Sequence, residues 1–370
     1  MYIQMTKNSD IRSLQCLLES MAAKDDVQSV IVLTCDGNGY TPDQLDPFLK
    51  RYPVQIFGGI FPQILYCQEH LEQGTVLVGL PFTTEICLFK GISRQKKRFS
   101  AGIDSMFTVV DPSDHSLFVF VDGMAQRIDS LIEDLYNHFG SFPNYIGGGA
   151  GSMSLKPSPC IITNNGLLQD AAVVALVDKR CSVGVAHGWH PFSKAIKVTE
   201  ADLNTVISFD WRPAFDVYRE IVEMHSGRRF SEIPFFELAK SYPLGIAKLE
   251  AEMVVRDPII EESGHLVCVG EIPVGSLIYI LHGDINSLVA GAASARRLAQ
   301  QSAVDPEQIQ CMFFADCISR VLFMESAFER EMVAVDYGVP LFGALTIGEI
   351  ANNGNASLEF FNKTAVVGLF

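Results

Sequence analysis

Four residues near the C-terminal end of the chain have side chains that could bind a small ligand. Asp316, Cys317 and Arg320 follow an apolar run at 311–315 that predicts a buried strand, and a helical pattern begins directly after them. The start of a helix favours an anionic group, and ligands of open α/β sheets tend to lie beyond the carboxyl ends of the strands. Glu349 ends a glycine-containing segment that would return to the same edge. We therefore expect these four residues to be ligand-binding.

These residue types allow more than one chemistry. Arg320 could hold a carboxylate through two hydrogen bonds, and Glu349 could pair with an amine or with Arg320 itself. A structural role fits equally well, with Asp316 capping the helix, Cys317 in the core, and Arg320 and Glu349 as an ion pair. Cys317 beside a helix start could be nucleophilic, but no partner base is visible. We expect no catalytic residues and no enzyme, with a Cys-dependent enzyme as an alternative.

Three histidines are candidates for a haem or metal site. His187 and His190 form the densest histidine cluster, directly after a predicted strand, and His282 ends another predicted strand. Trp189 and Phe192 could supply the apolar walls that haem requires. Alternatively, His187 and His190 are turn residues that bind backbone carbonyls. Two histidines without a Cys-x-x-Cys pair are too few for a zinc site.

Composition excludes several classes of protein. The chain has 370 residues, 48% of them hydrophobic and 19% charged, which is typical of a globular protein of about two domains. A net charge of −15 lacks the basic footprint of a nucleic-acid-binding protein. The nine cysteines are scattered and never spaced Cys-x-x-Cys, as in a reduced compartment. No signal peptide and no membrane span are visible, so we expect a cytoplasmic protein without a membrane partner.

The elements that must position the candidate residues recur along the chain. A buried strand, a helix and a second, glycine-containing strand appear in the same order three times, which predicts an α/β fold with mixed sheets. Strand-end aspartates precede the glycines at similar intervals, with Asp36 before Gly58, Asp122 before Gly147 and Asp316 before Gly343. Three similar closing strands follow, at 75–80, 171–177 and 365–370. We expect the first two to form hairpins with 85–89 and 182–186.

A different segment separates the second copy from the third. It contains a proline turn at 211–213 that enters a helix, and two further runs, 266–270 and 276–281, that predict another hairpin. We place a domain boundary in the polar stretch near 225. The predicted organisation is an N-terminal helix or arm at 1–28, a first domain at 29–225 and a second at 226–370.

Several short motifs resemble those of the FIST family, which has an N-terminal and a C-terminal domain. Residues 198–201 and 209–214 resemble the junction of the first domain, and the second domain is similar at 256–258, 272–276, 316–320, 348–350 and 362–364. The resemblance covers about residues 29–370. Two positions depart from it: Phe361 stands where the closing motif often has histidine, and 202–204 lack the usual glycine-asparagine pair.

The resemblance implies a soluble bacterial signal-transduction sensor that binds a small molecule. The chain is similar to stand-alone members that bind haem, sense nitric oxide and regulate a separate histidine kinase or cyclic-di-GMP enzyme, a diguanylate cyclase or phosphodiesterase. We expect either haem as the cofactor or no cofactor, and the alternative function is a sensor of a small carboxylate such as an amino acid. A homo-oligomer is compatible with this reading. The family motif at 316–320 supports a ligand-binding role for Asp316, Cys317 and Arg320.

Overall fold

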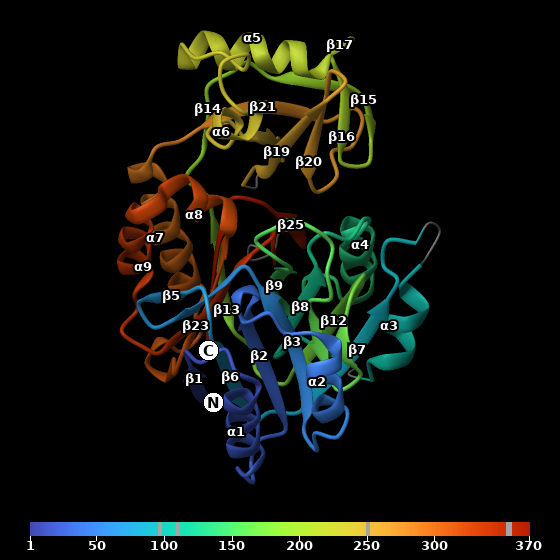
Figure 1. Ribbon diagram of the computed structural model, residues 1–370, viewed down its shortest axis with the longest axis vertical. Coiled ribbons are helices and arrows are strands. Elements are labelled where there is room, and N and C mark those ends of the chain that lie inside the picture. Colours follow the sequence, from blue (N-terminus) through green and yellow to red (C-terminus); the bar gives the residue numbers. More distant parts are fainter. Residues whose placement is uncertain (95–97, 109–110, 249–251, 353–356) are drawn as a thin grey trace.

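The protein consists of a three-sheet body and a cap that lies over one end of it (Figure 1). The computed structural model describes residues 1–370 except 95–97, 109–110, 249–251 and 353–356. We call residues 190–282 the cap and the remainder the body. The two termini of the chain lie close together on the body, away from the cap (Figure 1).

Three copies of one unit build the body. Each contains a strand, one or two helices, a parallel second strand, a short hairpin and a closing antiparallel strand. The first unit comprises β2 (Ser29–Cys35), α2 (Pro42–Leu49), β3 (Gln55–Phe61), β4 (Gln63–Tyr66), β5 (Glu69–Leu71) and β6 (Thr75–Leu80). The second comprises β8 (Ser116–Asp122), α4 (Ile128–Phe139), β9 (Asn144–Ala150), β10 (Ile161–Thr163), β11 (Gly166–Leu168) and β12 (Ala171–Val177). The third comprises β22 (Met312–Cys317), α8 (Ile318–Met324), α9 (Phe328–Val335), β23 (Leu341–Thr346), β24 (Glu349–Ala351), β25 (Glu359–Phe361) and β26 (Ala365–Leu369).

The units exchange their hairpins in a closed cycle. The β4–β5 hairpin of the first unit extends the sheet of the third, the β10–β11 hairpin of the second extends the first, and β24–β25 of the third extends the second. The other edge of each sheet is β1 (Tyr2–Thr6), β7 (Thr84–Lys90) or β13 (Ser182–Ala186). Each sheet therefore has six strands, and the predicted mixed α/β fold with its recurring unit is confirmed.

The core explains why these segments are strands. The central strands β2, β8, β12 and β22 are rich in valine, isoleucine and phenylalanine and are buried along their whole length, as the sequence pattern predicts. Phenylalanines of the three units meet where the sheets converge. Phe118 packs against Phe57, Phe313 and Phe370 with ring centroids 5.6–5.9 Å apart.

The other helices of the body cover its outside. These are α1 (Ile11–Ala22), α3 (Ser100–Met106) and α7 (Ile285–Gln301), and the described 3-10 turns are η1 (Asp36–Asn38), η2 (Pro306–Gln308) and η3 (Glu325–Ala327). Helix α1 begins at Asp10, which accepts a hydrogen bond from the backbone of Ser13 as an N-cap. The predicted N-terminal arm is thus part of the first sheet, since β1 pairs with β6.

The cap is an eight-stranded sheet with two helices. Its strands are β14 (His190–Pro191), β15 (Ile196–Asp202), β16 (Thr205–Phe209), β17 (Arg212–Pro213), β18 (Leu244–Ile246), β19 (Val254–Glu262), β20 (His265–Val269) and β21 (Leu277–His282), and its helices are α5 (Ala214–Ser226) and α6 (Phe235–Ala239). The predicted boundary near 225 falls at the end of α5. Strands from both sides of it share three of the four sheets.

Three predicted hairpins are wrong in their pairing. Strands β6 and β7 lie in different sheets, as do β12 and β13, and β20 and β21 are not neighbours. Both edges of β6 are already occupied by β1 and β2, and both edges of β12 by β7 and β8. The next strand in the chain has no free edge to pair with, so it crosses to another sheet.

The predicted glycine positions are equivalent in all three units. Gly58, Gly147 and Gly343 lie opposite Val32, Val119 and Phe314 of the parallel neighbour. A Cβ atom at each of the three would overlap the carbonyl oxygen of that neighbour. Gly58 and Gly147 also have φ values of +150° and +153°, which side chains disfavour.

The predicted strand-end aspartates, in contrast, are not equivalent. Each glycine lies opposite one residue of the first strand of its unit. Three residues further along that strand stand Cys35 in the first unit, Asp122 in the second and Cys317 in the third. Asp36 lies one residue after this position and Asp316 one residue before it. The unequal spacings between aspartate and glycine therefore reflect a shifted position of the acid and not only loops of different length.

Candidate functional site

Two adjoining cavities lie between the cap and the body. Both form where the second and third units place the carboxyl ends of their parallel strands, the usual position of ligands in α/β proteins. We name them the Cys317 cavity, of about 480 Å³, and the Glu271 cavity, of about 780 Å³, volumes that include space open to solvent. They share four apolar lining residues, which are Leu155, Ile259, Val269 and Ile347.

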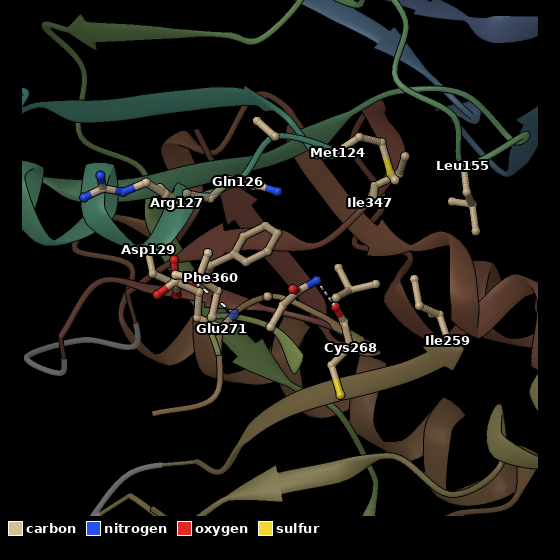
Figure 2. A pocket seen from close by; sticks show the side chains of 17 residues that line it. Met124, Gln126, Arg127, Asp129, Leu155, Ile259, Cys268, Glu271, Ile347 and Phe360 are labelled. Atoms are coloured by element: carbon tan, nitrogen blue, oxygen red, sulfur yellow. Dashed lines mark hydrogen bonds between the residues drawn. The ribbon is translucent and has the colours of Figure 1, made fainter. Parts of the chain in front are cut away.

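The Glu271 cavity is shown in Figure 2. Met124, Leu155 and Ile347 of the body lie across the cavity from Ile259 of the cap, while Cys268 turns its sulfur away from them. Glu271 and Asp129 lie at the other end, where the backbone N–H of Glu271 donates to Asp129 Oδ2 over 3.2 Å. Burial, and then the neighbouring Asp129, raises the pKa of Glu271 above its usual range.

The Cys317 cavity has apolar walls and a polar end. Its apolar lining comes from the loop after β9, from α6, β19, β20 and α8, and from the turn between β23 and β24, namely Met153, Leu155, Phe236, Ile259, Val269, Ile318, Leu322 and Ile347. The polar lining residues are Asp257, Cys317, Ser319 and Asn362. Ser319 Oγ donates to Asp257 Oδ2 over 2.6 Å, and Lys363 Nζ lies 3.2 Å from the same oxygen.

Arg320, which we expect to bind ligand, is fully buried and bonded to the protein. Its Nε lies 2.8 Å from Asp316 Oδ1, and one terminal nitrogen lies 2.5 Å from Glu331 Oε1 on α9. The terminal nitrogens also donate to the carbonyl oxygens of His187, Leu288 and Lys363 at 2.6–3.3 Å. All three guanidinium nitrogens therefore have protein partners.

Asp316 belongs to the same buried network. Burial, and then the nearby Glu331, raises the pKa of Asp316 well above its usual range, and Arg320 opposes this shift. The first unit has a neutral version of the pair, because Thr34 and Asn38 occupy the positions equivalent to Asp316 and Arg320. Asn38 Nδ2 donates to Thr34 Oγ1 over 2.8 Å and to a carbonyl oxygen in the loop before the closing strand β6. Arg320 likewise donates to a carbonyl oxygen in the loop before the closing strand β26. The equivalence indicates that the Asp316–Arg320 pair joins the strand end to this loop.

Glu349 does not contact Arg320 as an ion pair. Its Oε1 accepts from Thr346 Oγ1 over 2.7 Å, and its Oε2 from the backbone N–H of Thr364 over 3.2 Å. Burial raises the pKa of Glu349 to about 8, because these hydrogen bonds and one from Cys317 offset only part of the desolvation. Glu349 does not line the cavity, but it follows the lining residue Gly348 in the sequence and its carboxyl group contacts the lining residue Cys317.

Cys317 is the one predicted residue of the four that lines the cavity. It ends β22 and is the residue before α8, a helix of seven residues. Burial, and then the neighbouring Glu349, raises the pKa of the Cys317 thiol well above its usual range. The thiol form therefore predominates at neutral pH, which disfavours nucleophilic chemistry.

Sequence reasoning assigned no role to four residues that shape the polar end. Asp257, Ser319, Asn362 and Lys363 come from three separate segments, and only the fold brings them together. The signal that could have found them is in the motifs at 256–258 and 362–364, which carry the family resemblance. Asp257 and Lys363 are both buried, and their ion pair joins the cap to the body.

The three histidines lie outside both cavities. His187 is buried, with Nδ1 accepting from the backbone N–H of Trp189 over 2.9 Å and Nε2 lying 3.0 Å from Glu252 Oε1. His190 is exposed and lies opposite His282 in the β14–β21 pair. The His282 ring stacks on Tyr242 at 5.0 Å and directs Nδ1 toward the carbonyl of Ser241.

These surroundings do not fit haem at the described residues. Both nitrogens of His187 face protein partners, and neither His190 nor His282 borders one of the two apolar cavities. Within the part of the chain that the structure describes, no group of three or more metal-binding side chains comes together. Haem binding stays a prediction without geometric support.

Comparisons with known proteins agree with the sequence motifs. The model of the FIST N domain matches residues 29–212, and the model of the FIST C domain matches residues 214–352. No curated protein matches the chain. Among the described helices, none is long and apolar enough to cross a membrane.

Proposed function

The chain is a FIST domain protein, and we propose that it senses a small organic molecule bound between its cap and its body. FIST domains are associated with signal transduction through the sensing of small ligands. The observation that carries the proposal is the pair of joined cavities at the carboxyl ends of the body strands, with apolar walls and a polar end.

The position of the cavities supports a signalling role. Asp257, Ile259 and Val269 reach the Cys317 cavity from the cap, and Cys317 and Ile347 reach it from the body. A ligand that contacts both parts stabilises the arrangement in which both can contact it. The ligand would thereby change the population of cap positions, which an output protein can detect.

We infer that the protein binds its ligand without chemical turnover. The raised pKa of the Cys317 thiol supports this inference, because the thiolate is the nucleophilic form. A separate histidine kinase, diguanylate cyclase or phosphodiesterase as the output partner remains a prediction, as does location in the cytoplasm.

A ligand panel tests the proposal. Thermal unfolding of the wild-type protein is measured with small amines, amino acids, organic acids and haem. Leu322 lines the Cys317 cavity from α8, so Leu322→Trp should fill it, and Leu322→Met, of similar size, serves as the control. We expect at least one compound to raise Tm in wild type and in Leu322→Met, but not in Leu322→Trp. A panel without any shift, or an equal shift in all three proteins, would contradict the proposal.

The haem version has its own test. The protein is expressed with haem supplied and its absorption spectrum is recorded. A Soret band that moves when nitric oxide is added, and that disappears in the double variant His187→Ala/His190→Ala, would support haem sensing through these histidines. A colourless protein that takes up no haem excludes it.

A further inference from the structure

Two oxygen atoms of residues that line the Cys317 cavity have no hydrogen-bond donor among the described residues. They are Asp257 Oδ1 and Asn362 Oδ1, and each side chain is about 1% exposed. The other polar atoms of both residues are in use, since Asp257 Oδ2 accepts from Ser319 and Asn362 Nδ2 donates to the carbonyl of Phe361. A buried acceptor without a donor costs about 1–3 kcal/mol, so a ligand with N–H donors would recover that free energy.

The buried charges behind the cavity favour a cation. One buried carboxyl group, that of Asp257, lines the cavity, and those of Asp316, Glu331 and Glu349 are buried behind it, together with two cations, Arg320 and Lys363. A third buried cation, Arg256, faces the other way and pairs with Asp129. Burial raises the pKa of all four carboxyl groups, that of Glu349 to about 8, and a positively charged ligand nearby would favour their ionised forms.

A ligand carboxylate finds no partner in the same cavity. No lysine, arginine or histidine is among the described residues that line it. The two nearest buried cations are engaged, Arg320 as described above and Lys363 with Asp257, the carbonyl oxygen of Lys240 and the face of Trp189. An amino acid would therefore bury its carboxylate against apolar side chains and other carboxyl groups.

We propose that the ligand is an aliphatic primary amine, bound as its ammonium form with N–H groups donating to Asp257 Oδ1 and Asn362 Oδ1. The hydrocarbon chain lies along Leu155, Ile259, Val269 and Ile347, toward the Glu271 cavity. This inference rests on the proposed function, and it names the ligand class of that site.

Three compounds with the same branched chain test the inference by isothermal titration calorimetry. They are 3-methylbutylamine, leucine, which adds a carboxylate, and 3-methyl-1-butanol, which lacks the charge. We expect the amine to bind one per chain, leucine to bind about 100-fold more weakly, and the alcohol at least about 10-fold more weakly. Leucine binding as tightly as the amine would overturn the inference.

Variants locate the ammonium. Asp257→Asn and Asn362→Leu should each weaken amine binding about 10-fold or more, and the second leaves the Asp257–Lys363 ion pair in place if the first fails to fold. Glu262→Gln removes a charge from an exposed position on the same strand, β19, and should leave amine affinity unchanged. Equal amine affinity in wild type and Asn362→Leu would contradict the assignment.

The two proposals fail in different ways. If a compound other than an amine binds wild type and is excluded by Leu322→Trp, the amine inference is wrong and the cavity is still the sensing site. If the amine binds Leu322→Trp as tightly as wild type, it does not occupy the Cys317 cavity and this inference is also wrong.

Discussion

The third unit of the body differs from the first two at the ends of its strands. All three units have the same strand order and a glycine opposite the parallel neighbour. At one equivalent position of the hairpin, however, the third unit has Glu349, whereas the first has Ile64 and the second has Ile161. All three side chains are fully buried. Because two copies fold with isoleucine, the scaffold does not require a carboxyl group there. The comparison separates residues that build the unit from residues added to one copy.

The same comparison separates Arg320 from Glu349. Arg320 has a counterpart in Asn38, with the same connection to the loop before the closing strand. Glu349 has no polar counterpart in either of the other units. Arg320 thus belongs with the scaffold, and Glu349, with Cys317, Asp257 and Asn362, belongs with the cavity.

The largest effect should follow from replacing Arg320. Arg320→Met leaves Asp316 and Glu331 buried without their cation, which should lower the free energy of unfolding by about 3–5 kcal/mol. Asn38→Ala, at the equivalent position of the first unit, removes neutral hydrogen bonds and should cost about 1–2 kcal/mol. Urea unfolding of both variants measures the difference. Equal losses would show that the two positions are not a charged and a neutral form of one contact.

The shared glycines should respond alike in the three units. Gly58→Ala, Gly147→Ala and Gly343→Ala each place a methyl group against a backbone carbonyl, so each should destabilise the protein by about 3 kcal/mol. Urea unfolding again provides the measurement. A unit that tolerates the change would break the equivalence of the three copies.

Glu349 should make stability depend on pH. Its pKa is about 8 in the folded protein and near 4.5 when unfolded, so only the unfolded chain releases the proton between these values. The contribution of Glu349 to the free energy of unfolding is therefore largest below pH 4.5, falls as the pH rises from 4.5 to 8, and no longer changes above pH 8. Glu349→Gln removes the ionisation and should therefore gain stability relative to wild type from pH 5 to 8.

A matched variant isolates the effect of position 349. Ile161→Gln puts the same amide at the equivalent position of the second unit, where it should cost about 2 kcal/mol with no titration of its own. Thermal or urea unfolding across pH 5–9 compares the two. A stability difference between Glu349→Gln and wild type that does not change with pH would show that Glu349 has an ordinary pKa.

The smallest effect concerns thiol reactivity. Cys317 and its counterpart Cys35 are buried, and burial raises the pKa of both thiols, that of Cys35 to about 12. Iodoacetamide at neutral pH should therefore modify the exposed Cys16 and Cys67 first. Peptide mass spectrometry follows each site. Rapid labelling of Cys317 would reopen the Cys-dependent enzyme.

The sequence predicts the repeating unit because each buried strand is a continuous apolar run and each critical glycine precedes a recognisable closing strand. It does not predict which strands have a free edge for pairing. The predicted pairings of β7 with β6 and of β13 with β12 are therefore wrong. Cys317 could be placed at a strand end from the pattern alone. The partners of Arg320 and Glu349 could not, since Glu331, Thr346 and Thr364 are selected by packing between elements.

The residues missed at the polar end show a second limit. Asp257 lies on the cap and Asn362 on the last loop of the body, 105 positions apart in the numbering. Neither has a local pattern that marks an unpaired buried oxygen. Only the arrangement of the cap over the third unit makes them neighbours of Cys317.

Amide hydrogen exchange with and without 3-methylbutylamine tests most directly that the cavity of the third unit is the ligand site. We predict that the amine slows exchange in β19 and α8, which line the Cys317 cavity from the cap and from the body, and leaves exchange at residues 187–192 unchanged. Slower exchange confined to residues 187–192 and β21, with β19 and α8 unaffected, would place the ligand at the histidines and contradict the account.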